Sequence, residues 1–162
     1  MSTYTKNMHE QTMYPRLFEV VGEPMVRSAN RYARWDWSTQ TKQIELKKIH
    51  NVYSKYRCVL CGDKMLAADK TKTQIIFFEF VDGLYMYVVD PVAWNKFDRC
   101  PRTECVCIPR ELLQCVDVYK VTDEAMREAE RRHVVAKQKS FLEKRPRETT
   151  GVCCIVVQKR TR

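Results

Sequence analysis

The chain has 162 residues, of which 44% are hydrophobic and 10% aromatic, and its formal net charge at pH 7 is +9. This hydrophobic fraction excludes wholesale disorder, and the presence of only 4 glycines and 6 prolines excludes a low-complexity chain. No apolar run reaches the roughly 20 residues that span a bilayer, and the N-terminal segment has no apolar secretory core, so we expect an intracellular protein of the cytoplasm or nucleus.

The N-terminal part of the chain is predicted to combine an extended arm with a basic helix. Residues 12–26 include a short apolar run bounded by prolines, which predicts an extended segment docked on the core. Beyond it, three arginines recur at the spacing of one helical face, with an aromatic residue, Trp35, on another face. These arginines are Arg27, Arg31 and Arg34.

Two further apolar patterns lie in the middle of the chain. Between residues 39 and 56, apolar and aromatic side chains recur at helical spacing, which predicts an amphipathic helix running into a Cys-x-x-Cys pair. Residues 73–90 form two β-rich runs on either side of Asp82 and Gly83. They predict a hairpin, because a tight turn needs a residue that tolerates positive φ.

Two helices are predicted in the C-terminal third. Pro109 suits the first position of a helix, so residues 109–119 are expected to be helical, with Cys115 packed inside. A long helix is expected from about Thr122 to Lys144. Acidic residues occupy its first turns and basic residues its last turns, which suits the helix dipole.

The cysteines carry the strongest chemical signal. In an intracellular protein they are expected to be reduced, so close pairs indicate metal ligands or packing before disulfides. A Cys-x-x-Cys followed by glycine brings two thiolates of one turn to one metal ion, and a second pair must complete the site. The predicted ligands of a structural Zn²⁺ are Cys58, Cys61, Cys100 and Cys105, with Cys107 as an alternative to Cys105.

The predicted order of elements, a knuckle, a hairpin and then ligands near a helix start, resembles a treble-clef-like zinc finger. The resemblance is one of arrangement and covers about residues 56–118. The expected fold is α+β, a small treble-clef-like zinc-stabilised β-hairpin core flanked by amphipathic helices. Three segments follow: an N-terminal arm with basic and aromatic helices at 1–57, a Cys-rich zinc-binding core at 58–121, and a long charged helix with a basic tail at 122–162.

Other interpretations of the cysteines stay open. Cysteine behaves as a small hydrophobe, so core packing is an alternative to zinc. A redox Cys-x-x-Cys would follow a strand and open a helix, which differs from the predicted order. The adjacent Cys153 and Cys154 suit either a palmitoylated tail or a terminal strand. The chain shows no glycine-rich phosphate loop and no recognisable nucleophile context, so we expect no enzymatic activity.

Positive charge is concentrated in the flanks. Residues 1–57 and 122–162 each carry a net charge of +5, and residues 58–121 carry −1. This distribution predicts that the flanks hold a polyanion while the middle supplies the fold. The alternative to nucleic-acid binding is that Trp35 packs in a core and that the cations are simply exposed to solvent. The predicted nucleic-acid-binding residues are Arg27, Arg31, Arg34, Trp35, Arg131, Arg132, Lys137 and Lys139.

Two functions fit these patterns. The first is a non-enzymatic, zinc-binding, basic protein that contacts nucleic acid without sequence preference, through phosphates, within a larger complex. Viral and nuclear accessory factors have this character. The alternative is a structural or adaptor component of a protein assembly, such as a virion or nucleocapsid subunit, with no direct nucleic-acid contact. The apolar stretches at residues 12–26 and 150–157 favour contacts with protein.

Overall fold

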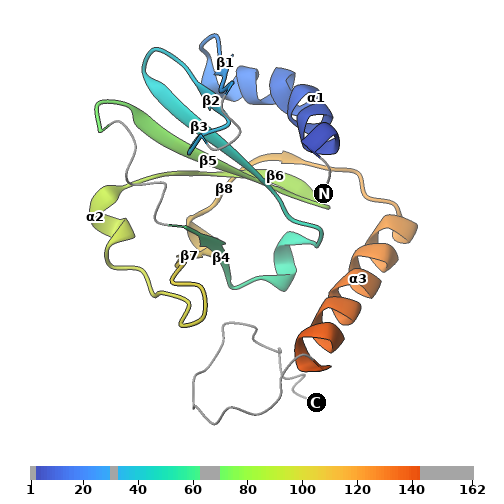
Figure 1. The fold of residues 1–162 in the computed structure, drawn as a ribbon. Helices are drawn as coiled ribbons and strands as arrows, with labels where there is room; N and C mark the ends of the chain where they lie inside the picture. Colours follow the sequence, from blue (N-terminus) through green and yellow to red (C-terminus); the bar gives the residue numbers. More distant parts are fainter. Residues whose placement is uncertain (1–2, 30–32, 63–69, 143–162) are drawn as a thin grey trace.

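The computed structural model describes residues 3–29, 33–62 and 70–142, which form the α+β fold in Figure 1. The elements of the N-terminal part are α1 (Thr3–Val21), β1 (Val26–Arg27), β2 (Trp37–Ser38), β3 (Lys42–Lys48), η1 (Tyr53–Lys55) and β4 (Cys58–Cys61). The elements that follow are β5 (Thr73–Phe80), β6 (Gly83–Val88), α2 (Pro91–Trp94), β7 (Val106–Pro109), η3 (Arg110–Leu112), β8 (Gln114–Val118) and α3 (Asp123–Leu142).

Six strands form one mixed sheet in the order β1-β2-β3-β5-β6-β8. β3 and β5 pair in parallel, from Lys42 beside Thr73 to Lys48 beside Glu79, and the other neighbours are antiparallel. The chain between β3 and β5 includes β4, which pairs with β7 in a second, two-stranded sheet. The large sheet therefore takes strands from both sides of the segment boundary predicted at residue 57.

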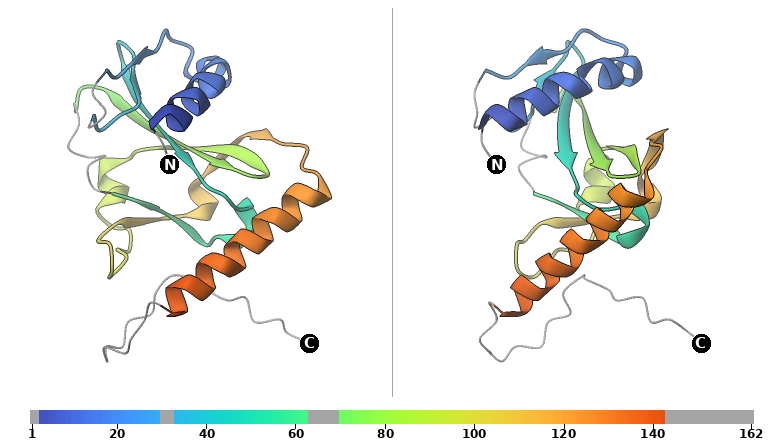
Figure 2. Two further views of the ribbon diagram at one scale, coloured as in Figure 1. Left: turned by 45° about the vertical axis from the view of Figure 1, so that its right-hand side comes forward. Right: turned by 90° about the vertical axis from the view of Figure 1, so that its right-hand side faces the viewer.

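Two hydrophobic cores lie on the two faces of the large sheet. The α1 core fills the space between α1 and the sheet, and Leu17, Ile44 and Phe77 are fully buried in it. The small-sheet core lies between the other face, β4, β7 and α2, and contains the fully buried Phe78 and Trp94. Figures 1 and 2 show the resulting layers, with α1 on one side of the sheet and the small sheet and α2 on the other.

The N-terminal segment is helical, so the predicted extended arm is wrong. Met13, Leu17 and Val21 share one face of α1 and are all buried in the α1 core. Pro15 lies inside the helix and is exposed. An interior proline costs about 3 kcal/mol, whereas each buried aliphatic side chain contributes about 1.5–3 kcal/mol. Burial of the apolar face therefore outweighs the lost backbone hydrogen bond.

The predicted helix over residues 39–56 is also wrong, because its first half is the strand β3. Ile44 and Leu46 alternate with polar residues, and both enter the α1 core. A short apolar pattern fits a period of 2 as well as 3.6. Here the backbone hydrogen bonds that β2 and β5 provide favour the strand over the helix. Only the single 3-10 turn η1 follows before β4.

The predicted helix over residues 109–119 is wrong for the same kind of reason. Pro109 ends β7, the 3-10 turn η3 follows, and the chain then enters β8. β8 pairs with β6 and forms an edge of the large sheet. Cys115 is exposed on this edge strand and does not pack inside a helix.

The hairpin predicted over residues 73–90 is confirmed as β5 and β6. Its two-residue loop begins at Val81, one residue earlier than expected, because Phe80 pairs with Gly83. The glycine is needed for space and not for a positive φ. A Cβ atom on Gly83 would lie 2.7 Å from the backbone oxygen of Asp117 in the neighbouring β8. Such a separation is shorter than a van der Waals contact.

The long helix is confirmed as α3, within the described residues. The Thr122 hydroxyl accepts a hydrogen bond from the Ala125 N–H at 3.2 Å, which caps the first turn. Ala129 is buried, whereas Val134 and Val135 are exposed by 52% and 51%. α3 therefore packs on the body through its first half. The basic tail, with its paired cysteines, lies outside the described residues.

Candidate functional site

The first predicted ligand pair, Cys58 and Cys61, lies on a strand that points the two side chains to opposite faces. β4 runs through the Cys-x-x-Cys, and in a strand residues three apart point to opposite faces. Val59 and Cys61 belong to the small-sheet core, so Cys58 lies on the other face. Three residues of strand also separate two Cα atoms by about 10 Å. The sequence predicts a knuckle, but the pairing of β4 with β7 makes this segment extended.

The second predicted pair is brought together by a tight loop. The Cys100 N–H donates to the Cys105 carbonyl oxygen at 2.8 Å, and the Glu104 N–H donates to the Cys100 carbonyl oxygen at 2.8 Å. Glu104 has a φ of 55°, which allows the chain to reverse within four residues. Cys107 lies two residues beyond Cys105 on β7, and Leu60 of β4 is its partner in the sheet.

These positions do not assemble the predicted zinc site within the part of the chain that the structure describes. Over residues 3–29, 33–62 and 70–142, no three His, Cys, Asp or Glu side chains gather closely enough to hold a metal ion. Cys61 is buried in the small-sheet core, and Cys100 and Cys107 are buried outside both hydrophobic cores. The structural zinc therefore stays a prediction of the sequence.

The basic helical face predicted near the N-terminus is not formed. Arg27 lies on β1 and binds the buried Glu10, with its Nη2 and Nε atoms 2.7 and 2.9 Å from Oε2. Arg34 is exposed, and Arg31 lies outside the described residues. Trp35 is only 6% exposed and belongs to the small-sheet core. This burial favours the alternative that Trp35 packs in a core, because a nucleic-acid base cannot stack on an indole inside a packed core.

The remaining predicted cations lie on α3. Arg131 and Arg132 contact Glu128 of the same helix at 3.0 and 2.8 Å, and their side chains are 68% and 61% exposed. Lys137 and Lys139 follow on the same helix. The helix is joined to the body by an ion pair between Glu130 and Lys55 of η1, at 3.2 Å. Its C-terminal end lies beyond the rest of the described chain in Figure 1.

A cluster of titratable groups that the sequence does not indicate lies where α1, β3, β5 and α3 approach. His9 Nε2 lies 2.6 Å from Glu79 Oε2, and Lys48 Nζ lies 3.9 Å from the same oxygen. Burial first, and then the positive charges of Lys48 and Arg132, lower the pKa of His50. The members come from distant parts of the chain, so no local motif could reveal them.

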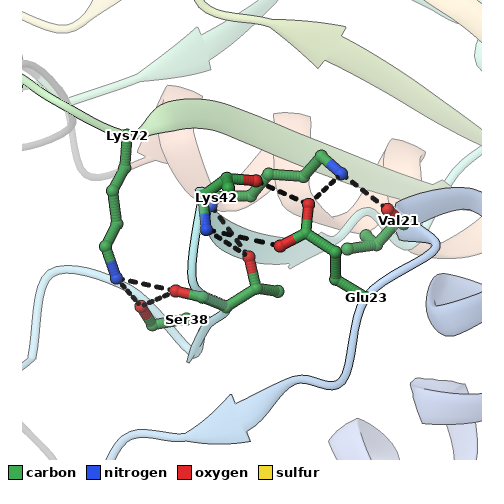
Figure 3. A network of polar contacts seen from close by, with 7 residues as sticks. Val21, Glu23, Ser38, Lys42 and Lys72 are labelled. Atoms are coloured by element: carbon green, nitrogen blue, oxygen red, sulfur yellow. Dashed lines mark hydrogen bonds and ion pairs between the residues drawn. The ribbon is translucent and has the colours of Figure 1, made fainter.

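A second polar network fastens the end of α1 to the β2–β3 turn (Figure 3). Glu23 accepts hydrogen bonds from Lys42 Nζ and the Thr41 hydroxyl, both at 2.5 Å. These contacts, led by the Lys42 ammonium, lower the pKa of the Glu23 carboxyl to about 2. Lys72, which directly precedes β5, reaches the same region, where its Nζ donates to the Ser38 hydroxyl at 3.0 Å. The charges of Glu23 and Lys42 pair within the network, which indicates a structural role.

An open hollow of about 340 Å³ lies beside the middle of α1. Residues of α1, β1 and β2 line it: Gln11, Tyr14, Pro15, Met25, Arg27 and Trp37. Its cation is already bound to Glu10, and the His9–Glu79 pair is not among the lining residues. The hollow therefore does not join a nucleophile and a base to a substrate-sized space.

Comparison of the chain with protein-family models, with curated proteins and with solved structures finds no match. In the described ranges, none of the helices combines the length and the apolar character that a bilayer crossing requires.

Proposed function

We propose that this protein is a non-enzymatic, basic protein that contacts nucleic acid through its phosphates, as one component of a larger complex. The observation that carries the proposal is the distal half of α3, residues 131–142. It contains four cations and no carboxylate, and it belongs to a chain of net charge +9. A cation-rich helix is suited to phosphate contact, which is led by charge and independent of sequence. Among these cations, the side chains of Arg131 and Arg132 are 68% and 61% exposed.

The contacts of these cations within the chain do not prevent this role. Arg131 and Arg132 both pair with Glu128, but the two arginine side chains are largely exposed and the Glu128 side chain is 41% exposed. Exposed ion pairs are weak, because water screens the charges. A phosphate that approaches α3 can therefore replace Glu128 at either guanidinium with little loss. Arg34, before β2, is a further exposed cation.

The test is a fluorescence-polarisation titration with single- and double-stranded DNA and RNA, at low and physiological salt. Binding is expected to weaken steeply with salt, because each neutralised phosphate releases condensed counterions. The double variant Arg131→Gln/Arg132→Gln should weaken binding to all sequences alike. The control, Lys96→Gln/Lys120→Gln, removes the same charge from exposed positions outside α3 and should have a smaller effect. Absence of binding to every probe at low salt would exclude this function.

The proposal that the protein also binds a structural Zn²⁺ rests on the sequence alone. It is tested by measuring the metal content of native protein by mass spectrometry, where about one zinc per chain is expected. Cys105→Ser should lower the zinc content, whereas Cys115→Ser, at an exposed position on β8, should not. A zinc-free native protein would remove the metal from the proposal and leave phosphate contact to its own test.

The adaptor alternative is favoured by one observation. Val134 and Val135 are both about half-exposed on α3. These neighbouring valines give α3 a small apolar surface that a partner protein can cover. A protein that holds nucleic acid within an assembly needs both surfaces, and α3 carries both.

A further inference from the structure

We propose that α3 is a self-association element, which pairs antiparallel with α3 of a second copy of this chain. This inference goes beyond nucleic-acid contact, because it concerns a surface that acts without nucleic acid. It rests on the arrangement of charge along α3, on the two exposed valines near the middle of the helix, and on the way in which the helix is joined to the body.

The charge of α3 is divided between its two halves. The proximal half, residues 123–130, has four acidic residues and one arginine, for a net charge of −3. The distal half, residues 131–142, has four basic residues and no acidic residue, for a net charge of +4. Two such helices side by side in parallel would place like charges together. An antiparallel pair places each acidic half beside a basic half, and it also opposes the two helix dipoles.

The apolar part of the surface lies where such a pair would cross. Val134 and Val135 are 52% and 51% exposed and lie close to the middle of α3. A two-fold axis next to them makes the contact isologous, so each valine pair packs against the same residues of the second copy. The same axis brings Glu130 of one copy level with Lys139 of the other, because helical rise is constant.

The attachment of α3 leaves this surface available. Two contacts hold the proximal half on the body: Ala129 is buried, and Glu130 pairs with Lys55 at 3.2 Å. Figures 1 and 2 show the helix continuing past the small sheet toward its C-terminal end. A second copy can therefore lie along α3 without displacing a core element. The occupant that fits both the charge pattern and the symmetry is the same helix.

The first experiment is sedimentation velocity of nuclease-treated protein over a range of concentrations. The wild type is expected to show a monomer–dimer equilibrium that strengthens at low salt. Val134→Asp/Val135→Asp should abolish the dimer, because four carboxylates would meet at the axis. Val118→Asp is the matched control, since Val118 is 70% exposed on β8, and it should leave the dimer unchanged. Circular dichroism of each variant should confirm that the fold is retained.

The second experiment exchanges the charges. Glu124→Lys/Glu128→Lys makes both halves of α3 positive, and Arg131→Glu/Lys137→Glu/Lys139→Glu makes both halves negative. Each variant alone should be monomeric, and an equimolar mixture should form a heterodimer. A wild type that stays monomeric at all concentrations, or a dimer indifferent to these changes, would overturn the proposal. Neither result bears on the nucleic-acid titration, so the two proposals can fail separately.

Discussion

Lys42 on β3 reaches back to the end of α1, where its Nζ lies 2.7 Å from the carbonyl oxygen of Val21 and 2.5 Å from Oε1 of Glu23. The carbonyl is one of the last four of the helix, which lack a donor within the helix. Gly22, with a φ of 70°, turns the chain away at this point. One ammonium thus completes the helix end and fixes it to the sheet.

The lowered pKa of Glu23 predicts that the stability of the protein depends on pH in the acidic range. Its folded-state pKa of about 2 lies below the ordinary value of 4.5, so the folded state binds fewer protons than the unfolded chain. The stabilisation is therefore present above pH 4.5 and is lost as the pH falls toward 2. Thermal unfolding midpoints of wild type and Glu23→Gln should differ at pH 6 and converge as the pH is lowered.

A matched control is Glu19→Gln, which removes a carboxylate from an exposed position on α1, four residues before Glu23. Its midpoint should follow that of the wild type at every pH. If Glu23→Gln has the wild-type midpoint at pH 6, the network does not stabilise the protein.

Burial of Trp35 predicts a stability effect and no direct binding effect. Trp35→Ala should lower the free energy of unfolding by about 3–5 kcal/mol, because it leaves a cavity in the small-sheet core. Trp35→Phe should cost less, since the indole Nε1 has no hydrogen-bond partner among the described residues. Urea unfolding measures both changes. Weaker nucleic-acid binding by fully folded Trp35→Phe would instead indicate a stacking role.

The lowered pKa of His50 predicts that α3 loosens in mild acid. Burial, and then the positive charges of Lys48 and Arg132, lower the pKa of His50 in the folded state. Glu79 raises this pKa, and His9 lowers it slightly further. Stability is therefore greatest above pH 6.5 and falls as the pH drops through the folded-state pKa. The protection factors of the α3 amides, which correct for the slower intrinsic exchange in acid, should fall below pH 6.5 in the wild type. His50→Gln should flatten this dependence, and an unchanged profile in that variant would contradict the assignment.

The close approach of β8 predicts that Gly83 cannot carry a side chain. Gly83→Ala places a Cβ atom 2.7 Å from the backbone oxygen of Asp117, so β6 and β8 must separate. Overpacking of this kind costs about 1–3 kcal/mol, to be measured by urea unfolding. Val88→Ala, at an exposed position of the same strand, should cost less. Equal free energies of unfolding for the two variants would show that β8 can move away from β6 without a loss of stability.

The elements that the sequence determined by itself are those specified by neighbouring residues. The β5–β6 hairpin follows from two β-rich runs joined at a short turn, and α3 follows from its length and its gradient of charge. In both, the local pattern and the final structure agree, so no distant partner was needed to choose between alternatives. The exposure of Arg131 and Arg132 also follows from the surrounding charge.

The tertiary structure decided the segments whose pattern fits more than one element. β3 is a strand because β2 and β5 supply backbone partners, and α1 is a helix because its apolar face has a sheet to cover, despite Pro15. The same reason governs the candidate site. Pairing with β7 makes the Cys-x-x-Cys a strand, and the alternation of a strand sends Cys58 and Cys61 to opposite faces, which no spacing along the chain could reveal.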